Sequence, residues 1–184
     1  MQGGTSTGRT STDNCEVVAK APEVSLLGAP YCHQDTNWLT QVKLLASYQV
    51  PVVDLQVSGT FQSVPGVAIS GNYNAPFAVY GPSLGRVVSG GNANSTVQVN
   101  LVAPGTEYGD RIQQLDLRIG RVLNVGRTRS TVNVDVYNAF NANPVLGVNN
   151  TYNAAPVAAL SSAWQAPQSI LTARFVKFSV NFTF

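Results

Sequence analysis

The last fifteen residues, Ile170 to Phe184, carry the most regular pattern in the chain, and this pattern constrains the fold more than any other feature. Apolar and polar side chains alternate, with Val176, Phe178, Val180, Phe182 and Phe184 on one face and Lys177, Ser179, Asn181 and Thr183 on the other. A period of two predicts a β-strand, because successive side chains leave a strand on opposite sides. Since about 9–11 residues cross a bilayer as a strand, this segment is long enough to span one.

Two interpretations of this strand are open. It fits the closing strand of an outer-membrane barrel, with the apolar face toward lipid and the polar face toward the lumen. It equally fits the final strand of a soluble β-sandwich, whose buried face alternates in the same way. The rest of the chain has to decide between them.

Charged residues are scarce, and this composition favours the membrane interpretation. They make up only 11% of the chain, against about 25% in ordinary soluble domains. A barrel can meet lipid on its outside and line its lumen with neutral polar groups. The net charge of +2 is too small to indicate nucleic-acid binding. The chain has no run of about 18 apolar residues, which excludes a membrane-spanning helix.

Four further segments alternate like the last one. Strands are predicted at Trp38–Val50, Val53–Val64, Asp110–Val125 and Thr131–Phe140, and a weaker, partial strand at residues 2–13. Within the second long loop, Ser95–Val102 predicts another short strand. Arg121 falls on an apolar face near the end of its strand, where its side chain can reach the lipid headgroups.

The lengths of the connections decide the fold. They alternate strictly between long (14–37, 65–110, 141–169) and short (51–52, 126–130). Transmembrane barrels have short periplasmic turns and longer extracellular loops, whereas both ends of a soluble sandwich face the same water. We therefore predict an all-β fold, an antiparallel transmembrane barrel meander of about six long strands. Residues 51–52, 126–130 and Phe184 are expected on the periplasmic side.

Six strands are too few to close around a charged lumen, because closed outer-membrane barrels begin at about eight strands. We expect residues 1–184 to be one C-terminal portion of a larger barrel, in which Met1 need not be a native start. Asp116 and Arg118 share the lumen face and are predicted to form a charge pair. The residues predicted to face the lumen with a charge are Lys43, Asp54, Asp116, Arg118, Asp135 and Lys177.

The two cysteines, Cys15 and Cys32, both lie in the first long loop. Their spacing fits neither a zinc site nor a CxxC redox pair. In an exported protein, two cysteines in one loop predict a disulfide. His33 and Asp35 stand beside Cys32, and we expect them to be loop residues without a metal-ligand role.

No motif of enzyme chemistry is evident in the sequence. A Ser-His-Asp triad would depend on His33 alone, and neither a phosphate loop nor a GxGxxG motif after a strand occurs. We therefore expect neither an enzyme nor a bound cofactor.

The run VNVDVYNAFNANPV, from Val132 to Val145, resembles the strand and asparagine-rich exit near the C-terminus of TonB-dependent outer-membrane receptors. The segments WLTQVKLLASYQVP, VSGTFQSVPG, YGDRIQQLDLRIGRVL and ILTARFVKFSVNFTF together resemble the Oar-like branch of that family, whose members carry a carboxypeptidase-regulatory-like domain before the plug. The closing strand is similar to the signal read by the barrel-assembly machinery, which implies an assembly role for Phe178, Val180, Phe182 and Phe184.

The resemblance implies a bacterial outer-membrane location and uptake of a scarce ligand, whose identity the sequence does not give. No TonB box, plug or regulatory-like domain stands in these 184 residues. Contact with the TonB complex is therefore expected only through N-terminal parts absent from the chain, and the direct partners are outer-membrane lipid and the assembly machinery. The alternatives are a surface structural or adhesive protein and a small stand-alone barrel.

Overall fold

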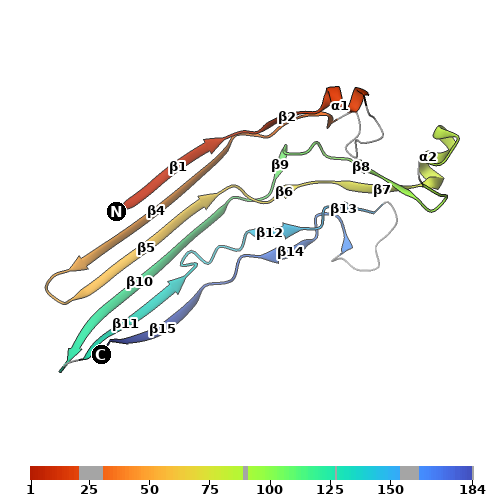
Figure 1. Cartoon of the computed structure of the whole chain (residues 1–184). Coiled ribbons are helices and arrows are strands. Elements are labelled where there is room, and N and C mark those ends of the chain that lie inside the picture. Colours follow the sequence, from red (N-terminus) through yellow and green to blue (C-terminus); the bar gives the residue numbers. More distant parts are fainter. Residues whose placement is uncertain (21–30, 89–90, 127, 154–161, 184) are drawn as a thin grey trace.

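The computed structural model describes the chain except for residues 21–30, 89–90, 127, 154–161 and 184, and it is mostly β-strand with antiparallel sheets. Six strands form one large antiparallel sheet, which we call the wall (Figure 1). In spatial order the wall consists of β1 (Gln2–Gly8), β4 (Leu39–Val50), β5 (Leu55–Val64), β10 (Ile112–Val125), β11 (Thr128–Tyr137) and β15 (Phe175–Thr183).

The register of the wall places the predicted apolar faces of β4, β5, β10, β11 and β15 on one side. Partners across an antiparallel pair share a face, so consecutive partners form rows that cross the sheet. Two such apolar rows are Ala46, Gly59, Leu117, Val136 and Val176, and Tyr48, Val57, Ile119, Val134 and Phe178. The sequence prediction of the two faces is confirmed for these five strands.

No second layer of described residues covers the apolar face of the wall, and only Phe140, in the turn after β11, stands edge-to-face against its Phe61. Phe178 is 75% exposed and Val176 is 50% exposed, whereas Ala75, outside the wall, is the one hydrophobic residue buried in the described part of the chain. Polar residues of the chain are buried instead, with Asp135 only 3% exposed. This distribution is the reverse of a water-soluble domain, in which apolar side chains fill the core.

The two edges of the wall are not joined. Of the pairings formed by described residues, none links β1 to β15, so the sheet is open and no closed barrel is found. The sequence prediction of antiparallel β-structure is confirmed at this level.

Short and long connections leave opposite ends of the wall (Figure 1). The β4–β5 and β10–β11 hairpin turns and the end of β15 lie together at one end, which we call the turn end. The predicted boundaries at these turns were wrong. Val53 and Asp54 belong to the first turn rather than to β5, and Asp54 has a left-handed backbone with φ 48°. At the second turn, Gly126 has φ 59° and β11 begins already at Thr128, inside the predicted turn.

The predicted last strand is likewise divided. Ile170 ends a separate short strand, and β15 starts at Phe175, while Phe184 lies outside the described residues. The prediction for residues 131–140 ran too far, because β11 ends at Tyr137 and Phe140 lies in the following turn.

At the other end, the long connections continue as short strand pairs and two helices, which we call the extension (Figure 1). A three-stranded sheet in the order β13-β7-β8 confirms the predicted short strand within residues 95–102. The elements of the extension are β2 (Ser11–Asp13), α1 (Cys15–Lys20), β3 (His33–Asp35), β6 (Ala68–Ile69), β7 (Asn72–Pro76), α2 (Phe77–Leu84), β8 (Thr96–Asn100), β9 (Glu107–Tyr108), β12 (Val145–Val148), β13 (Thr151–Tyr152) and β14 (Pro167–Ile170).

Candidate functional site

The polar face of the wall brings together five of the six predicted lumen charges. The register places Lys43, Asp116, Arg118, Asp135 and Lys177 on this face, across β4, β10, β11 and β15. Asp54 does not join them, because it lies in the β4–β5 turn. The charges form a band across the sheet and come from residues far apart in the sequence.

The predicted pair of Asp116 with Arg118 is wrong. Arg118 instead binds Asp135 on the neighbouring strand through two contacts, from Nε to Oδ1 at 2.5 Å and from Nη2 to Oδ2 at 3.2 Å. A two-point contact of this kind fixes the guanidinium plane as well as its position. Lys177 stands opposite Asp135 on the other side, so this carboxylate lies between two cations.

Asp116 belongs to a separate hydrogen-bond network on the polar face. Gln62 donates a hydrogen bond to Gln114 at 2.9 Å, and Gln114 donates to both carboxylate oxygens of Asp116 at 3.0 Å. The carboxylate also accepts the backbone N–H of Asn138 at 2.8 Å. Its oxygens are thus occupied by neutral donors, which is a structural arrangement rather than an acid–base pair.

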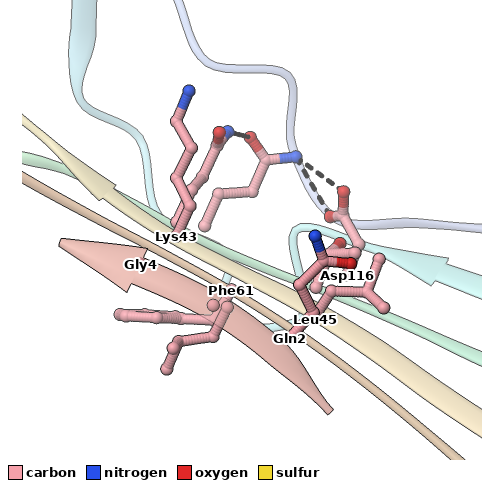
Figure 2. A pocket seen from close by; sticks show the side chains of 11 residues that line it. Gln2, Gly4, Lys43, Leu45, Phe61 and Asp116 are labelled. Atoms are coloured by element: carbon pink, nitrogen blue, oxygen red, sulfur yellow. Dashed lines mark hydrogen bonds between the residues drawn. The ribbon is translucent and has the colours of Figure 1, made fainter. Parts of the chain in front are cut away.

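A hollow of about 630 Å³ is lined by residues of β1, β4, β5 and β10, among them Lys43, Gln62, Gln114 and Asp116. Figure 2 shows Lys43 and Asp116 on one side of the strands and Phe61 on the other. On the polar face the hollow offers an ammonium, carboxamides and a carboxylate, which suits contact with polar groups. The described residues contain no cluster of three or more metal-ligating side chains.

Asn138 was not singled out by the sequence analysis, although it organises the exit from β11. It is 2% exposed and has a left-handed backbone, with φ 49°. Its side-chain amide donates to the carbonyls of Ala142 and Thr172, both at 2.8 Å, and its Oδ1 accepts the Ala142 N–H at 3.0 Å. Asparagine suits this position because its short side chain tolerates a positive φ. The asparagine-rich exit was the available signal.

Asn141 completes this clamp between the third connection and the start of β15. Its backbone is also left-handed, with φ 53°, and its Oδ1 accepts the backbone N–H of Arg174 at 3.0 Å. The two asparagines therefore tie the two ends of a long connection together at the border of the wall.

The predicted disulfide between Cys15 and Cys32 is confirmed, with Cα atoms 4.7 Å apart. Beside it, His33 lies between two carboxylates, with Nδ1 3.3 Å from Asp13 Oδ2 and Nε2 3.4 Å from Asp35 Oδ2. Hydrogen bonds to Asp13 and to Asp35 raise the pKa of His33 above its ordinary value.

Both carboxylates around His33 are held in the charged form. A backbone hydrogen bond from Cys15 and a side-chain bond to His33 lower the pKa of Asp13. A side-chain hydrogen bond with Ser11, followed by the charge of Arg9 nearby, lowers the pKa of Asp35. Arg9 Nη2 stands 3.3 Å from Asp35 Oδ2. Arg9, Asp13, His33 and Asp35 therefore form an exposed charge network that links β2 to β3.

The long connections contact one another in the extension. Asn37 donates its backbone N–H to Gly105 at 3.2 Å and its side-chain amide to Thr106 at 2.7 Å, which joins the first connection to the second. The second and third connections meet where the Trp164 indole donates to the Ser70 carbonyl at 2.8 Å. There β13 also pairs in parallel with β7.

The comparisons with known proteins give no relative: no protein-family model, curated protein or solved structure matches this chain. Neither of the described helices is long and apolar enough to cross a membrane.

Proposed function

We propose that the wall is a sector of a transmembrane β-barrel in the bacterial outer membrane, and that the chain is the C-terminal barrel part of a TonB-dependent transporter. The observation that carries the membrane assignment is the reversed burial in the wall. Val176 and Phe178 are exposed on a continuous apolar face, while Asp135 and Asn133 on the other face are buried. Lipid supplies the solvent that such a face requires.

The dimensions of the apolar face agree with this proposal. Arg111 and Arg121 flank Leu115, Leu117 and Ile119 on this face and are ten residues apart (121 − 111). Beyond Arg121 the face continues toward the turn end with Leu123 and Phe182. At about 3.4 Å per residue this separation is about 34 Å along the strand, and a tilt of about 40° reduces it to about 26 Å. The apolar band of an outer-membrane barrel is about 25 Å tall.

In the proposed transporter, the Arg118–Asp135–Lys177 band lines the lumen, and the extension forms part of the outer rim that captures the ligand. The sequence resemblance supports the choice of family, since it covers most of the chain in the family's order. Energy would come from the TonB complex through parts of the protein outside these residues. The final strand, with Phe178, Val180 and Phe182, would present the assembly signal to the barrel-assembly machinery.

Single cysteines in β15 test the membrane assignment. Cysteines at Phe178 and Val180 should react with lipid-phase reagents, whereas cysteines at the matched neighbours Ser179 and Asn181 should not. Equal reaction of both faces with water-soluble reagents would remove the membrane assignment.

Transport needs a separate test in the full-length parent protein. Ligand uptake should stop when the proton-motive force is collapsed, and deleting α2 should weaken ligand binding while the barrel still assembles. Uptake that persists without the proton-motive force contradicts the transporter proposal but leaves the wall untouched.

The extension also favours a second candidate function, adhesion to another surface. Its helix α2 exposes two apolar side chains, with Val79 54% and Leu84 44% exposed. Adhesion is favoured over transport if deletion of α2 abolishes attachment to cells or matrix, and if neither the parent protein nor the deletion variant takes up a ligand.

A further inference from the structure

The apolar face of the wall carries a single charge within its described strands, Arg121. The register places it between Leu55 on β5 and Val132 on β11, in the row next to the turn end that also holds Val180. Arg121 is exposed, and it forms no ion pair with any residue that the structure describes. A cation among aliphatic side chains requires an anion or water at its tip.

The same face is hollowed a short distance away. A concavity of about 410 Å³ lies over β4, β5 and β10. It coincides with the row in which Ala46 and Gly59 stand side by side, so that the larger side chains of the rows around them form its rim. The apolar residues that line it include Leu44, Ala46, Tyr48, Val57, Phe61 and Leu117.

The position of Arg121 relative to this hollow matches the shape of a phospholipid. Leu117, at the hollow, precedes Arg121 by four residues on β10, which is about 14 Å along a strand. Between them the surface is apolar, formed by Ile119 and its partner Val57. A phosphate bound at Arg121 would therefore direct an acyl chain over Ile119 and into the hollow, toward the middle of the apolar band.

We propose that this strip is a specific binding site for one phospholipid of the leaflet at the turn end. The Arg121 guanidinium binds the phosphate through charge-assisted hydrogen bonds, and the Ala46–Gly59 hollow holds one acyl chain. The inference rests on the proposed membrane wall and adds a defined partner at a defined place. Charge complementarity at Arg121 and the apolar lining of the hollow together select a lipid with an anionic phosphate.

The experiment uses the full-length parent barrel in vesicles of phosphatidylethanolamine and phosphatidylglycerol, with a phosphatidylglycerol probe carrying a photoreactive diazirine on its acyl chain. Cross-linked residues are mapped by mass spectrometry. Wild-type protein should be labelled several-fold more at the hollow than on the β11–β15 part of the same face. Ala46→Phe, which fills the hollow, should abolish this preference.

Val176→Phe is the matched control, because Val176 lies in the same register row as Ala46 but on β15, away from the hollow. It should leave the preference unchanged. Arg121→Gln should reduce labelling at the hollow several-fold and Arg121→Lys should reduce it less. A diacylglycerol probe with the same chain but no phosphate should label the hollow no better in wild type than in Arg121→Gln.

The outcomes separate this inference from the proposed function. Even labelling across the whole apolar face overturns the lipid site while the membrane wall stands. Labelling on neither part of the face contradicts the wall and the site together. Preference for the hollow that survives Arg121→Gln and is shared by the diacylglycerol probe would overturn the role assigned to the phosphate.

Discussion

The wall and the extension of this chain are both β-structure, yet they are stabilised in different ways. The wall consists of strands of 7 to 14 residues with an exposed apolar face. The extension consists of strands of 2 to 5 residues and two short helices. Ala75, the one buried hydrophobic residue of the described chain, belongs to the extension.

The two regions differ because a strand surrounded by lipid and a strand in water bury their side chains differently. In the wall, long ladders satisfy the backbone and the apolar face needs no protein cover if lipid surrounds it. In the proposed transporter the extension lies in water and has to supply its own contacts. It uses the Cys15–Cys32 disulfide and edge-to-face aromatic pairs of Tyr152 with Tyr73 and with Trp164. Within the extension the connections differ in charge, since no charged residue stands between Asn141 and Ile170, whereas the first connection carries the His33 network.

An arginine placed on the apolar face should have the largest effect on the stability of the wall. The absence of any effect would contradict contact of this face with lipid. Val176 lies in the row of Leu117, close to the middle of the band between Arg111 and Arg121. Val176→Arg should destabilise the folded, membrane-inserted chain by about 2–4 kcal/mol, the cost of an arginine near the bilayer midplane. The measurement is a urea titration of the full-length parent barrel in lipid vesicles.

Depth provides the control for this prediction. Val180 lies four residues closer to the turn end of β15 than Val176. Val180→Arg should therefore cost only about 0–1 kcal/mol, as expected near an interface. Equal costs at the two positions would argue against a bilayer around the wall.

Removing the disulfide tests the extension in the same way. The bridge closes a sequence separation of 17 residues, and a cross-link of this size contributes roughly 3 kcal/mol to stability by restricting the unlinked chain. Replacing Cys15 and Cys32 by serine should speed proteolysis and amide exchange around β2 and β3.

Insertion of the wall should not change in the same double variant, because the bridge joins residues outside the six strands. Loss of membrane insertion would show that the stability of the wall depends on the extension, which would contradict their separate stabilisation.

The sequence predicted the wall well because its signal is local and repeated. Alternation in β4, β5, β10, β11 and β15 requires only that each strand have two faces, and antiparallel hairpins then align those faces. Turn boundaries were less predictable. Val53 and Asp54 continue the alternating pattern, yet the chain turns there with Asp54 in a left-handed conformation, which residue type alone does not announce.

The sequence predicted which face of the wall the charged residues lie on better than it predicted their partners. Sequence spacing places Asp116 and Arg118 on one side of a strand, but partner choice depends on the register with β11, which brings Asp135 opposite Arg118. The contacts between the long connections could not be predicted either, because they join residues far apart in the sequence. Trp164 and Ser70, for example, are 94 residues apart.

The Asn138 clamp lies at the border between the two regions, and its loss should have an intermediate effect. Asn138→Ala removes two donated and one accepted side-chain hydrogen bond at a buried, left-handed position. We expect a loss of about 2 kcal/mol, because buried carbonyls and an amide lose their partner. Urea titration in lipid vesicles gives the value.

Two variants separate the causes of that loss. Asn138→Gly keeps the freedom for a positive φ and should recover only the backbone part of the cost. Asn153→Ala, at an exposed asparagine of the same connection, should have no measurable effect. If Asn138→Ala lowers the stability no more than Asn153→Ala does, the hydrogen bonds of Asn138 do not stabilise the junction between the wall and the extension.

The smallest effect is expected from pH, and it should be confined to the extension. His33 has a raised pKa, so its contribution is fully present below its ordinary value of 6.5 and is lost as pH rises through the higher folded value. Asp13 and Asp35 have lowered pKa values, so their contribution is present above 3.8 and is lost as pH falls through the lower folded values. The β2–β3 pair should therefore be most stable between about pH 4 and 6.5. Since these side chains are exposed, the change should be small.

An NMR titration of the His33 ring should give a pKa above 6.5. His33→Gln should abolish the loss of β2–β3 amide protection above neutral pH. The amide protection of the wall should be the same in wild type and in His33→Gln. A His33 pKa at or below 6.5 would show that the two carboxylates do not hold the imidazolium in solution.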